Sequence, residues 1–281
     1  MGSTQSPLRY PGGKSILSEY LGNVLAENQL SGSTYVEPYA GGAGAALALL
    51  FSDRVSKICL NDIDIHIYSM WNSILERPDD FLRLVEDTPI TIKEWHKQEN
   101  IYSHHKDYSS LDVGFATFFL NRCNRSGILY ARPIGGLKQD GEWKLDARFN
   151  KTKLLKKVEK IAYRADSISF DNMDAQNFIK ERVGPLARKE SVFVYYDPPY
   201  FKNGKQLYLN HYDDEAHENL AVFIMSQTKF CWLLSYDDVP EIRHLYGNMV
   251  IRELGLFHFA YRARKGKELL ITDHRLTLPR T

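Results

Sequence analysis

The sequence has little cysteine, no long apolar run and almost no net charge, and each absence excludes a class of protein. Its three cysteines, Cys59, Cys123 and Cys231, lie far apart and form no CxxC pair. This spacing argues against a disulfide framework and a zinc site, and it fits a reducing cytoplasm. No apolar run approaches the ~20 residues of a membrane span, and the N-terminus lacks a signal-peptide pattern. We therefore expect a cytoplasmic protein that contacts no membrane and binds no metal.

The net charge of +1 hides a strongly basic segment. Residues 122–164 contain twelve Lys or Arg and four Asp or Glu, a local charge of +8, so the remainder of the chain carries −7. A polyanion would be attracted to this segment first. For residues 153–160 alone a solvated helix face is the preferred interpretation, but the excess extends across the whole segment.

The 281 residues suffice for one large domain or for one domain with an insertion, and the composition, 43% hydrophobic and 25% charged, is that of a globular protein. Residues 191–196 are apolar and β-branched, as in a strand buried on both faces. Asp197, Pro198, Pro199 and Tyr200 follow, and two prolines cannot continue a parallel strand. The strand ends there, at the edge where open α/β sheets bind ligands. An ordinary turn capped by Asp197 is the plainer alternative.

A glycine-rich turn predicts a second part of the site. A short strand at 34–36 enters a turn with Gly41, Gly42 and Gly44, and an Ala/Leu helix follows, as in the nucleotide-binding corner of a Rossmann-like sheet. The next strand, 58–61, ends in Asp62 and Asp64, about 20 residues further on, where a ribose-binding carboxylate is expected. Asp62 follows the strand most directly, and Asp64 could equally cap the next helix. The residues alone leave both open.

The alternation of strands and helices stops at Ile65 and resumes after residue 164. Between these points the patterns are helical and rich in aromatic residues, and the polar, Arg-bearing and Gly-broken stretch 121–136 suggests an exposed loop or hairpin. Forked Arg and Asn donors suit base edges, but composition alone favours an ordinary surface loop equally. The sheet resumes with strands near 167–170, 191–196, 229–235, 248–251 and 267–272. Asp174, after the first of these, predicts either a helix N-cap or a contact with an adenine ring.

Five motifs in this order resemble the DNA adenine N6-methyltransferases of the Dam type (D12 class). They are Tyr10–Lys14, Val36–Gly44, Asn61–Asp64, Phe119–Arg122 and Asp197–Tyr200. The resemblance implies a Rossmann-like, S-adenosylmethionine-dependent α/β methyltransferase sheet with an inserted, mostly helical target-recognition domain. The catalytic and cofactor-binding domain would comprise residues 1–64 and 165–281, and the inserted domain residues 65–164, with its hairpin near 121–136.

The same resemblance implies residue roles in cofactor binding. Lys14 would lie near the methionine carboxylate, Asp62 would bind the ribose hydroxyls and Asp174 would sit near the adenine ring. The full set expected at the cofactor is Tyr10, Lys14, Glu37, Tyr39, Ala40, Gly41, Gly42, Gly44, Asp62, Ile63, Asp174 and Asp197.

The expected DNA contacts come from the N-terminus and the predicted hairpin. They are Arg9, Asn121, Arg122, Asn124, Arg125, Ser126, Tyr130, Arg132 and Lys138. Family members that methylate GATC have an aromatic residue and Asn before the hairpin Gly-Leu, whereas Arg125 and Ser126 stand there in this chain. Tyr130 stands where those enzymes have a guanine-reading Arg. This departure argues against GATC as the recognition sequence.

The residues also predict a mechanism. The exocyclic amine of adenine is a poor nucleophile, and the Asp197 carboxylate with the Pro198 carbonyl can accept its two hydrogens and steer the nitrogen toward sp³ geometry. Pro198 and Pro199 would hold these acceptors rigidly. The base must leave the duplex, at a cost of a few kcal/mol, and Tyr200 is placed to stack on it. We expect no metal and no covalent intermediate.

Several alternatives remain at this point. Cytosine N4 methylation uses a similar motif, and a catalytically silent DNA-binding homologue is a candidate of another class; RNA or protein methylation is more distant. Cytosine C5 methylation is excluded because no cysteine follows a proline, and the absence of a P-loop glycine argues against a nucleotide hydrolase. The expected partner is double-stranded DNA, and we expect a monomer. Whether a cognate restriction endonuclease or defence-system component belongs with it is left open.

Overall fold

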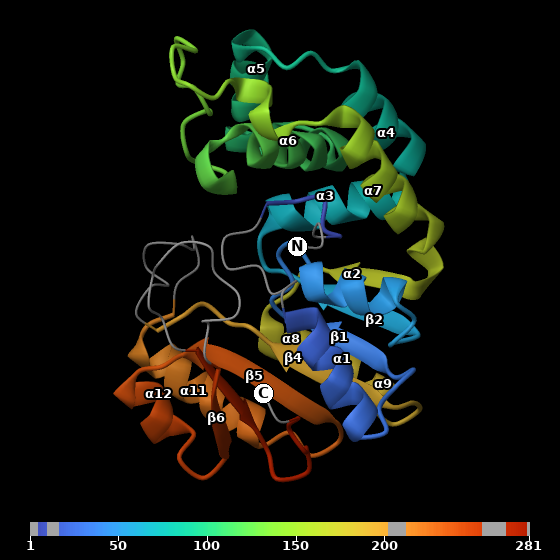
Figure 1. Ribbon diagram of the computed structural model, residues 1–281, viewed down its shortest axis with the longest axis vertical. Helices are drawn as coiled ribbons and strands as arrows, with labels where there is room; N and C mark the ends of the chain where they lie inside the picture. Colours follow the sequence, from blue (N-terminus) through green and yellow to red (C-terminus); the bar gives the residue numbers. More distant parts are fainter. Residues whose placement is uncertain (1–4, 10–16, 202–211, 255–267, 280–281) are drawn as a thin grey trace. The chain divides into compact units, whose positions relative to one another are not determined.

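The computed structural model describes residues 5–9, 17–201, 212–254 and 268–279. The chain divides into two compact units (Figure 1). Unit 1 comprises the described parts of Met1–Ser15, Gly41–Ala48 and Leu60–Asn172. Unit 2 comprises the described parts of Ile16–Ala40, Leu49–Cys59 and Met173–Thr281. Unit 1 thus contains the whole of 65–164 together with shorter flanking pieces, and the functional boundaries stated above stay a prediction.

Within the described residues, seven strands form one sheet in the order β3-β2-β1-β4-β5-β7-β6. Strand β1 pairs in parallel with β4 and β4 with β5, whereas β7 runs antiparallel to both β5 and β6. The order β3-β2-β1-β4-β5 is that of a Rossmann-like sheet, so the predicted α/β class is confirmed. The strands are β1 (Thr34–Glu37), β2 (Lys57–Asn61), β3 (Ile168–Asp171), β4 (Val192–Tyr196), β5 (Cys231–Asp237), β6 (Val250–Leu254) and β7 (Glu268–Thr272).

The core of unit 2 forms around strands β4 and β5. Every residue of β1 and of β4 is buried, as expected for parallel strands covered on both faces. Val194, Trp232 and Ile271 belong to one apolar cluster with residues of the surrounding helices. These helices are α8 (Ala175–Phe178), the π-helical turn η6 (Ile179–Val183), α9 (Gly184–Leu186), α11 (Asp214–Met225) and α12 (Pro240–Leu245). Helix α1 (Ser18–Glu27) also belongs to unit 2.

Unit 1 is mostly helical, as predicted for the inserted segment. Residues 65–164 contain helices, short 3-10 turns and an isolated antiparallel bridge between Asn124 and Pro133. The helices are α3 (Ile65–Glu76), α4 (Pro78–Asp87), α5 (Ile92–Ser103), α6 (Ser110–Cys123) and α7 (Lys151–Tyr163). The 3-10 turns are η2 (His105–Asp107), η3 (Arg125–Gly127), η4 (Leu145–Arg148) and, just after this segment, η5 (Ala165–Ser167). Helix α2 (Gly44–Phe51) begins in unit 1 and ends in unit 2.

Close packing of α3 on α6 sets the frame of unit 1 (Figure 1). A Cβ atom at Gly114 would lie 2.4 Å from the backbone oxygen of Ser69, so the two helices can approach this closely only with glycine there. Phe81 packs edge-to-face on Phe118 with 5.4 Å between ring centroids, a geometry that aromatic pairs favour. Among the described helices, none combines the length and apolar character needed to cross a membrane.

Candidate active site

In unit 2, the carboxylate of Asp197 lies directly after the buried strand β4. The Ser235 hydroxyl donates a hydrogen bond to Asp197 Oδ1 at 2.8 Å, and the Tyr195 hydroxyl lies 2.8 Å from Ser235 Oγ. Ser235 belongs to the neighbouring strand β5, whose register places Leu233 beside Tyr195 and Leu234 beside Tyr196. The acid at the carboxyl end of one strand is thereby held from the next strand of the sheet.

Two further acids hold the segment that follows Asp197. The Tyr200 hydroxyl donates to Glu268 Oε1 at 2.6 Å, and the Phe201 backbone N–H donates to Asp237 Oδ1 at 3.0 Å. Asp237 and Glu268 lie opposite each other where β5 pairs with β7. Burial raises the pKa of the Tyr200 hydroxyl well above its usual value, and the charges of Asp197 and Glu268 add to this. Tyr200 therefore remains a donor, and its ring packs partly against the core.

The end of β1 contributes a buried acid to unit 2. Glu37 is buried, and its Oε1 accepts a hydrogen bond from the Tyr35 hydroxyl at 3.0 Å. The Tyr39 and Tyr212 hydroxyls lie 3.0 Å apart, and Ala40 is buried. Tyr39 and Ala40 lead directly into the glycine-rich turn, which belongs to unit 1.

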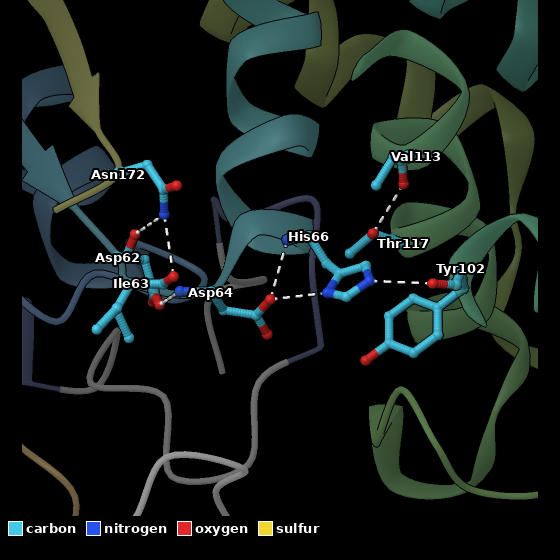
Figure 2. Close-up of polar contacts among 8 residues, drawn as sticks. All are labelled: Asp62, Ile63, Asp64, His66, Tyr102, Val113, Thr117 and Asn172. Atoms are coloured by element: carbon cyan, nitrogen blue, oxygen red, sulfur yellow. Dashed lines mark hydrogen bonds and ion pairs between the residues drawn. The ribbon is translucent and has the colours of Figure 1, made fainter. Parts of the chain in front are cut away.

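In unit 1, the turn is tied to Asp62. The Gly41 N–H donates to Asp62 Oδ2 at 2.9 Å, and the Asp64 N–H donates to Asp62 Oδ1 at 3.0 Å (Figure 2 shows the latter). Gly41 has φ of +46°, which glycine adopts without strain. Gly42 is buried beside it and Gly44 begins α2. Burial raises the pKa of Asp62 to about 6, although the two backbone N–H groups oppose the shift.

Asp64 has a different role from Asp62. Its Oδ1 accepts a hydrogen bond from the His66 N–H at 2.9 Å, so Asp64 is the N-cap of α3. The same oxygen lies 2.9 Å from His66 Nδ1, and His66 Nε2 lies 3.1 Å from the Tyr102 carbonyl oxygen (Figure 2). This capping role favours Asp62 over Asp64 as the acid that binds a ligand.

The backbone after Asp62 is held by an asparagine that the sequence analysis did not single out. Asn172 Nδ2 donates to the carbonyl oxygens of Asp62 at 2.8 Å and Ile63 at 3.0 Å (Figure 2). Ile63 leaves 53% of its surface exposed. In unit 2, Asp174 is exposed and caps α8 by accepting from the backbone N–H groups of residues 176 and 177.

Both asparagines expected to contact DNA, Asn121 and Asn124, are buried in unit 1. Asn121 Oδ1 accepts from the Arg9 N–H at 2.7 Å, and its Nδ2 donates to the Arg9 carbonyl at 2.9 Å and the Gly127 carbonyl at 2.8 Å. Asn124 Nδ2 donates to two carbonyls of the following loop, at Ile128 and Leu129, and its Oδ1 accepts from an indole N–H at 2.7 Å. Both amides therefore hold the loop from within.

Arg9 and Arg122, which are partly buried, also bind backbone oxygens. Arg9 Nη1 donates to the Asn124 carbonyl at 3.0 Å, and Arg122 Nε donates to the Arg148 carbonyl at 2.8 Å. Burial, with the nearby Arg9 charge adding, lowers the pKa of Arg122 to about 10. A Cβ atom at Gly127, where φ is +78°, would lie 2.4 Å from the Arg9 carbonyl oxygen, so this close approach requires glycine. The expected DNA contacts that are exposed are Arg125, Ser126, Tyr130, Arg132 and Lys138.

A second loop presents a tryptophan next to these exposed residues in the chain. Gln139 Nε2 donates to the carbonyls of residues 134 and 136, and its Oε1 accepts from the Leu145 N–H at 2.8 Å. The loop held in this way leaves Trp143 63% exposed. The signal available from the sequence was a Trp within a polar, Lys-containing stretch.

Two of the expected cofactor residues, Tyr10 and Lys14, lie outside the described residues.

Solved structures and curated sequences give little further information. An rRNA methyltransferase, aviRa from Streptomyces viridochromogenes, matches in two structures at 11% identity and TM-scores of 0.41 and 0.40, over 94% of this chain and 86% of that chain. A Listeria monocytogenes protein, provisionally described as a class I S-adenosylmethionine-dependent methyltransferase, matches at 12% identity and a TM-score of 0.40, over 96% of this chain and 63% of that one. No curated protein sequence gives a significant match.

The family assignment rests on a family model. The model described as D12 class N6 adenine-specific DNA methyltransferase matches residues 10–258, which is most of the chain. This match confirms the resemblance and favours neither of the alternatives, cytosine N4 methylation and a silent DNA-binding homologue. The chain belongs to the D12 class N6 adenine-specific DNA methyltransferases, enzymes that methylate adenine in DNA with S-adenosylmethionine as the donor.

Proposed function

We propose that Asp197 and the backbone carbonyl of Pro198 accept the two N6 hydrogens of the target adenine. The observation that supports this is the position of Asp197, whose carboxylate follows the buried strand β4 and is held by a buried hydroxyl. Two acceptors at fixed positions draw the amine nitrogen toward sp³ geometry and make its lone pair available. The proton that leaves after methylation can pass to the Asp197 carboxylate.

The cofactor proposal assigns the remaining acids and the glycine-rich turn. When bound, S-adenosylmethionine supplies an electrophilic methyl group on its sulfonium. The Asp62 carboxylate accepts two backbone N–H groups and has lone pairs for hydroxyl donors, which fits a ribose. Exposed Ile63 fits the face of an adenine ring. The other proposed residues are Glu37, Tyr39, Ala40, Gly41, Gly42, Gly44, Asp174, Tyr10 and Lys14.

We further propose that the target base is flipped out of the duplex and stacks on Tyr200. The hydrogen bond from the Tyr200 hydroxyl to Glu268 supports this, because it fixes the orientation of the ring. Stacking would offset part of the few kcal/mol that unpairing costs. Pro199 limits the freedom of the backbone immediately before the ring.

The proposed DNA surface consists of the exposed residues of unit 1. Their charge suits a phosphate backbone, and their forked or aromatic side chains suit base contacts. The exposed residues of this surface are Arg125, Ser126, Tyr130, Arg132, Lys138 and Trp143. Asn121, Asn124, Arg9 and Arg122 would act indirectly, by holding the loop that carries the exposed residues. We propose double-stranded DNA with a recognition sequence other than GATC, and a monomer acting in the cytoplasm, because one chain contains both the catalytic and the recognition segments.

The deciding experiment is long-read modification sequencing of DNA from cells that express the protein, with Asp197→Ala as the control. N6-methyladenine in one short motif, absent from the Asp197→Ala cells, is the expected result and identifies the site. A motif methylated at nearly every occurrence would support protection of DNA from a cognate restriction endonuclease. N6-methyladenine that persists in the Asp197→Ala cells would overturn the catalytic assignment.

A further inference from the structure

A directed chain of hydrogen bonds runs from Tyr195 through Ser235 to Asp197. Ser235 Oγ lies 2.8 Å from both the Tyr195 hydroxyl and Asp197 Oδ1. An ionised carboxylate can only accept, and a serine hydroxyl has one hydrogen to donate. Ser235 therefore donates to Asp197, and Tyr195 donates to Ser235.

The sheet geometry accounts for this chain. The parallel register places Tyr195 beside Leu233, and side chains two residues apart on a strand share a face. Asp197 is two residues beyond Tyr195, and Ser235 is two beyond Leu233. Tyr195, Ser235 and Asp197 consequently lie on one face of the sheet, at the carboxyl ends of neighbouring strands.

The two hydroxyls behind Asp197 are shielded from water. Ser235 is 0% exposed and Tyr195 is 1% exposed, so no solvent competes for the hydrogen bonds, which are stronger at low dielectric. Burial raises the pKa of Tyr195 well above its usual value, and the Asp197 charge adds to this. Tyr195 therefore remains protonated and keeps donating.

We propose that Ser235, itself oriented by Tyr195, is a positioning residue for methyl transfer that holds the Asp197 carboxylate in the orientation in which it accepts from the adenine amine. The inference rests on the proposed role of Asp197. Positioning of this kind acts on the chemical step, because a carboxylate that rotates away from the amine cannot favour the reactive geometry. It does not act on the affinity for cofactor or DNA.

The test is a single-turnover methylation assay at saturating cofactor and DNA, with Kd measured separately for each. We expect Ser235→Ala to lower the single-turnover rate on the order of 10- to 100-fold, the range seen for outer-shell groups that orient the ligands of metal sites, and to leave both Kd values within about 2-fold. Ser235→Thr keeps a hydroxyl and should recover most of the rate. Tyr195→Phe should have a smaller effect, because Ser235 can still donate without it.

The double variant Ser235→Ala/Tyr195→Phe shows whether Tyr195 affects the rate through Ser235 (a relay) or independently of it. If Tyr195 acts through Ser235, the double variant should be no slower than Ser235→Ala alone, because residues in one network are non-additive. If the rate loss of the double variant were the product of the losses of the two single variants, the relay would be overturned.

The matched control is Thr272→Val on β7. Its hydroxyl is also buried and donates to the Trp232 carbonyl at 2.5 Å, so its loss also removes a buried hydrogen bond in the same sheet. The single-turnover rate should stay near wild type. A Ser235→Ala variant as fast as wild type would overturn the positioning role. If Thr272→Val were slowed as much as Ser235→Ala, the loss would reflect any missing buried hydrogen bond, and the positioning role would also be overturned. Wild-type turnover by Asp197→Ala in the same assay would instead overturn the proposed function itself.

Discussion

The two units hold their key acids by different means. In unit 2, Asp197 is held by the hydroxyl of Ser235, and the segment after it by the carboxylates of Asp237 and Glu268. In unit 1, Asp62 is held by backbone N–H groups of Gly41 and Asp64. A side-chain partner can be removed by one substitution, whereas a backbone partner cannot. Variants of Asp197 and its partners should alter the chemical step, whereas variants of Asp62 should alter cofactor binding.

The largest effect that would sharpen this contrast is expected for Asp62→Ala. Loss of a charged acceptor for two ribose hydroxyls, at about 1.5 kcal/mol or more each, should raise the Kd for S-adenosylmethionine roughly 100-fold. The rate at saturating cofactor should fall much less. Isothermal titration calorimetry measures the Kd. Asp64→Asn is the matched control, because Asn is an equally good N-cap. Equal weakening by both variants would contradict the assignment of the ribose to Asp62.

The pKa of Asp62, raised to about 6 mainly by burial, gives cofactor binding a pH dependence. Hydroxyl donors favour the ionised carboxylate, so binding below that pH must release a proton. Affinity for S-adenosylmethionine should rise with pH through about 6 and level off above it, by up to about 10-fold per unit on the acid side. The Kd measured from pH 5 to 8 checks this. Asp62→Asn should lose the dependence; its persistence would point to another group.

Trp143→Ala tests whether an exposed residue of unit 1 contributes to DNA binding without affecting the chemical step. Stacking on a base is worth about 1–3 kcal/mol, so the Kd for cognate DNA should rise roughly 5-fold or more, with the saturated rate little changed. Fluorescence anisotropy with a labelled duplex gives the Kd. Tyr163→Ala is the control, since Tyr163 is an even more exposed aromatic residue, at 89%, and ends helix α7. Similar Kd values for both variants would remove Trp143 from the DNA surface.

The smallest effect is expected for Tyr200→Phe in unit 2. The substitution removes the hydrogen bond to Glu268 and keeps the ring that the proposal stacks on the flipped adenine. Single-turnover rates should fall less than about 5-fold, in line with the ~1 kcal/mol of one hydrogen bond, whereas Tyr200→Ala should lose much more. If Phe and Ala were equally slow, the hydroxyl rather than the ring would be the functional part.

The sequence predicts the sheet well because its signals are local. Continuous apolar runs and the turn with Gly41 identify the parallel strands and the α/β class, and the segment 65–164 is helical as expected. Ser235 shows why the site is harder. It reads as one more residue of a buried strand, and its contact with Asp197 depends on the register between β4 and β5, which no local pattern specifies.

Burial is the other property that residue type does not reveal. An asparagine in a basic loop can read a base or hold the backbone, and the sequence does not distinguish the two. The structure buries Asn121 and Asn124 and leaves Arg125 exposed. Asn172 is exposed, and it escapes prediction for a different reason, because an amide that binds backbone carbonyls has no sequence motif.

The bonds made by Asn172 have a consequence for how such enzymes can diversify. Asn172 binds the carbonyls of Asp62 and Ile63, and the Asp62 N–H donates to the Asp171 carbonyl at 3.2 Å. The chain therefore leaves the sheet at the end of β2 and returns to it at β3, and hydrogen bonds join the ends of these two strands although about a hundred residues lie between them. The entropy of closing so long a loop grows only slowly with its length. Because α3 packs on β3, that helix must stay, but beyond it segments of other lengths and sequences could thus be inserted without moving either strand, so that new DNA sequences are recognised while the chemistry stays the same.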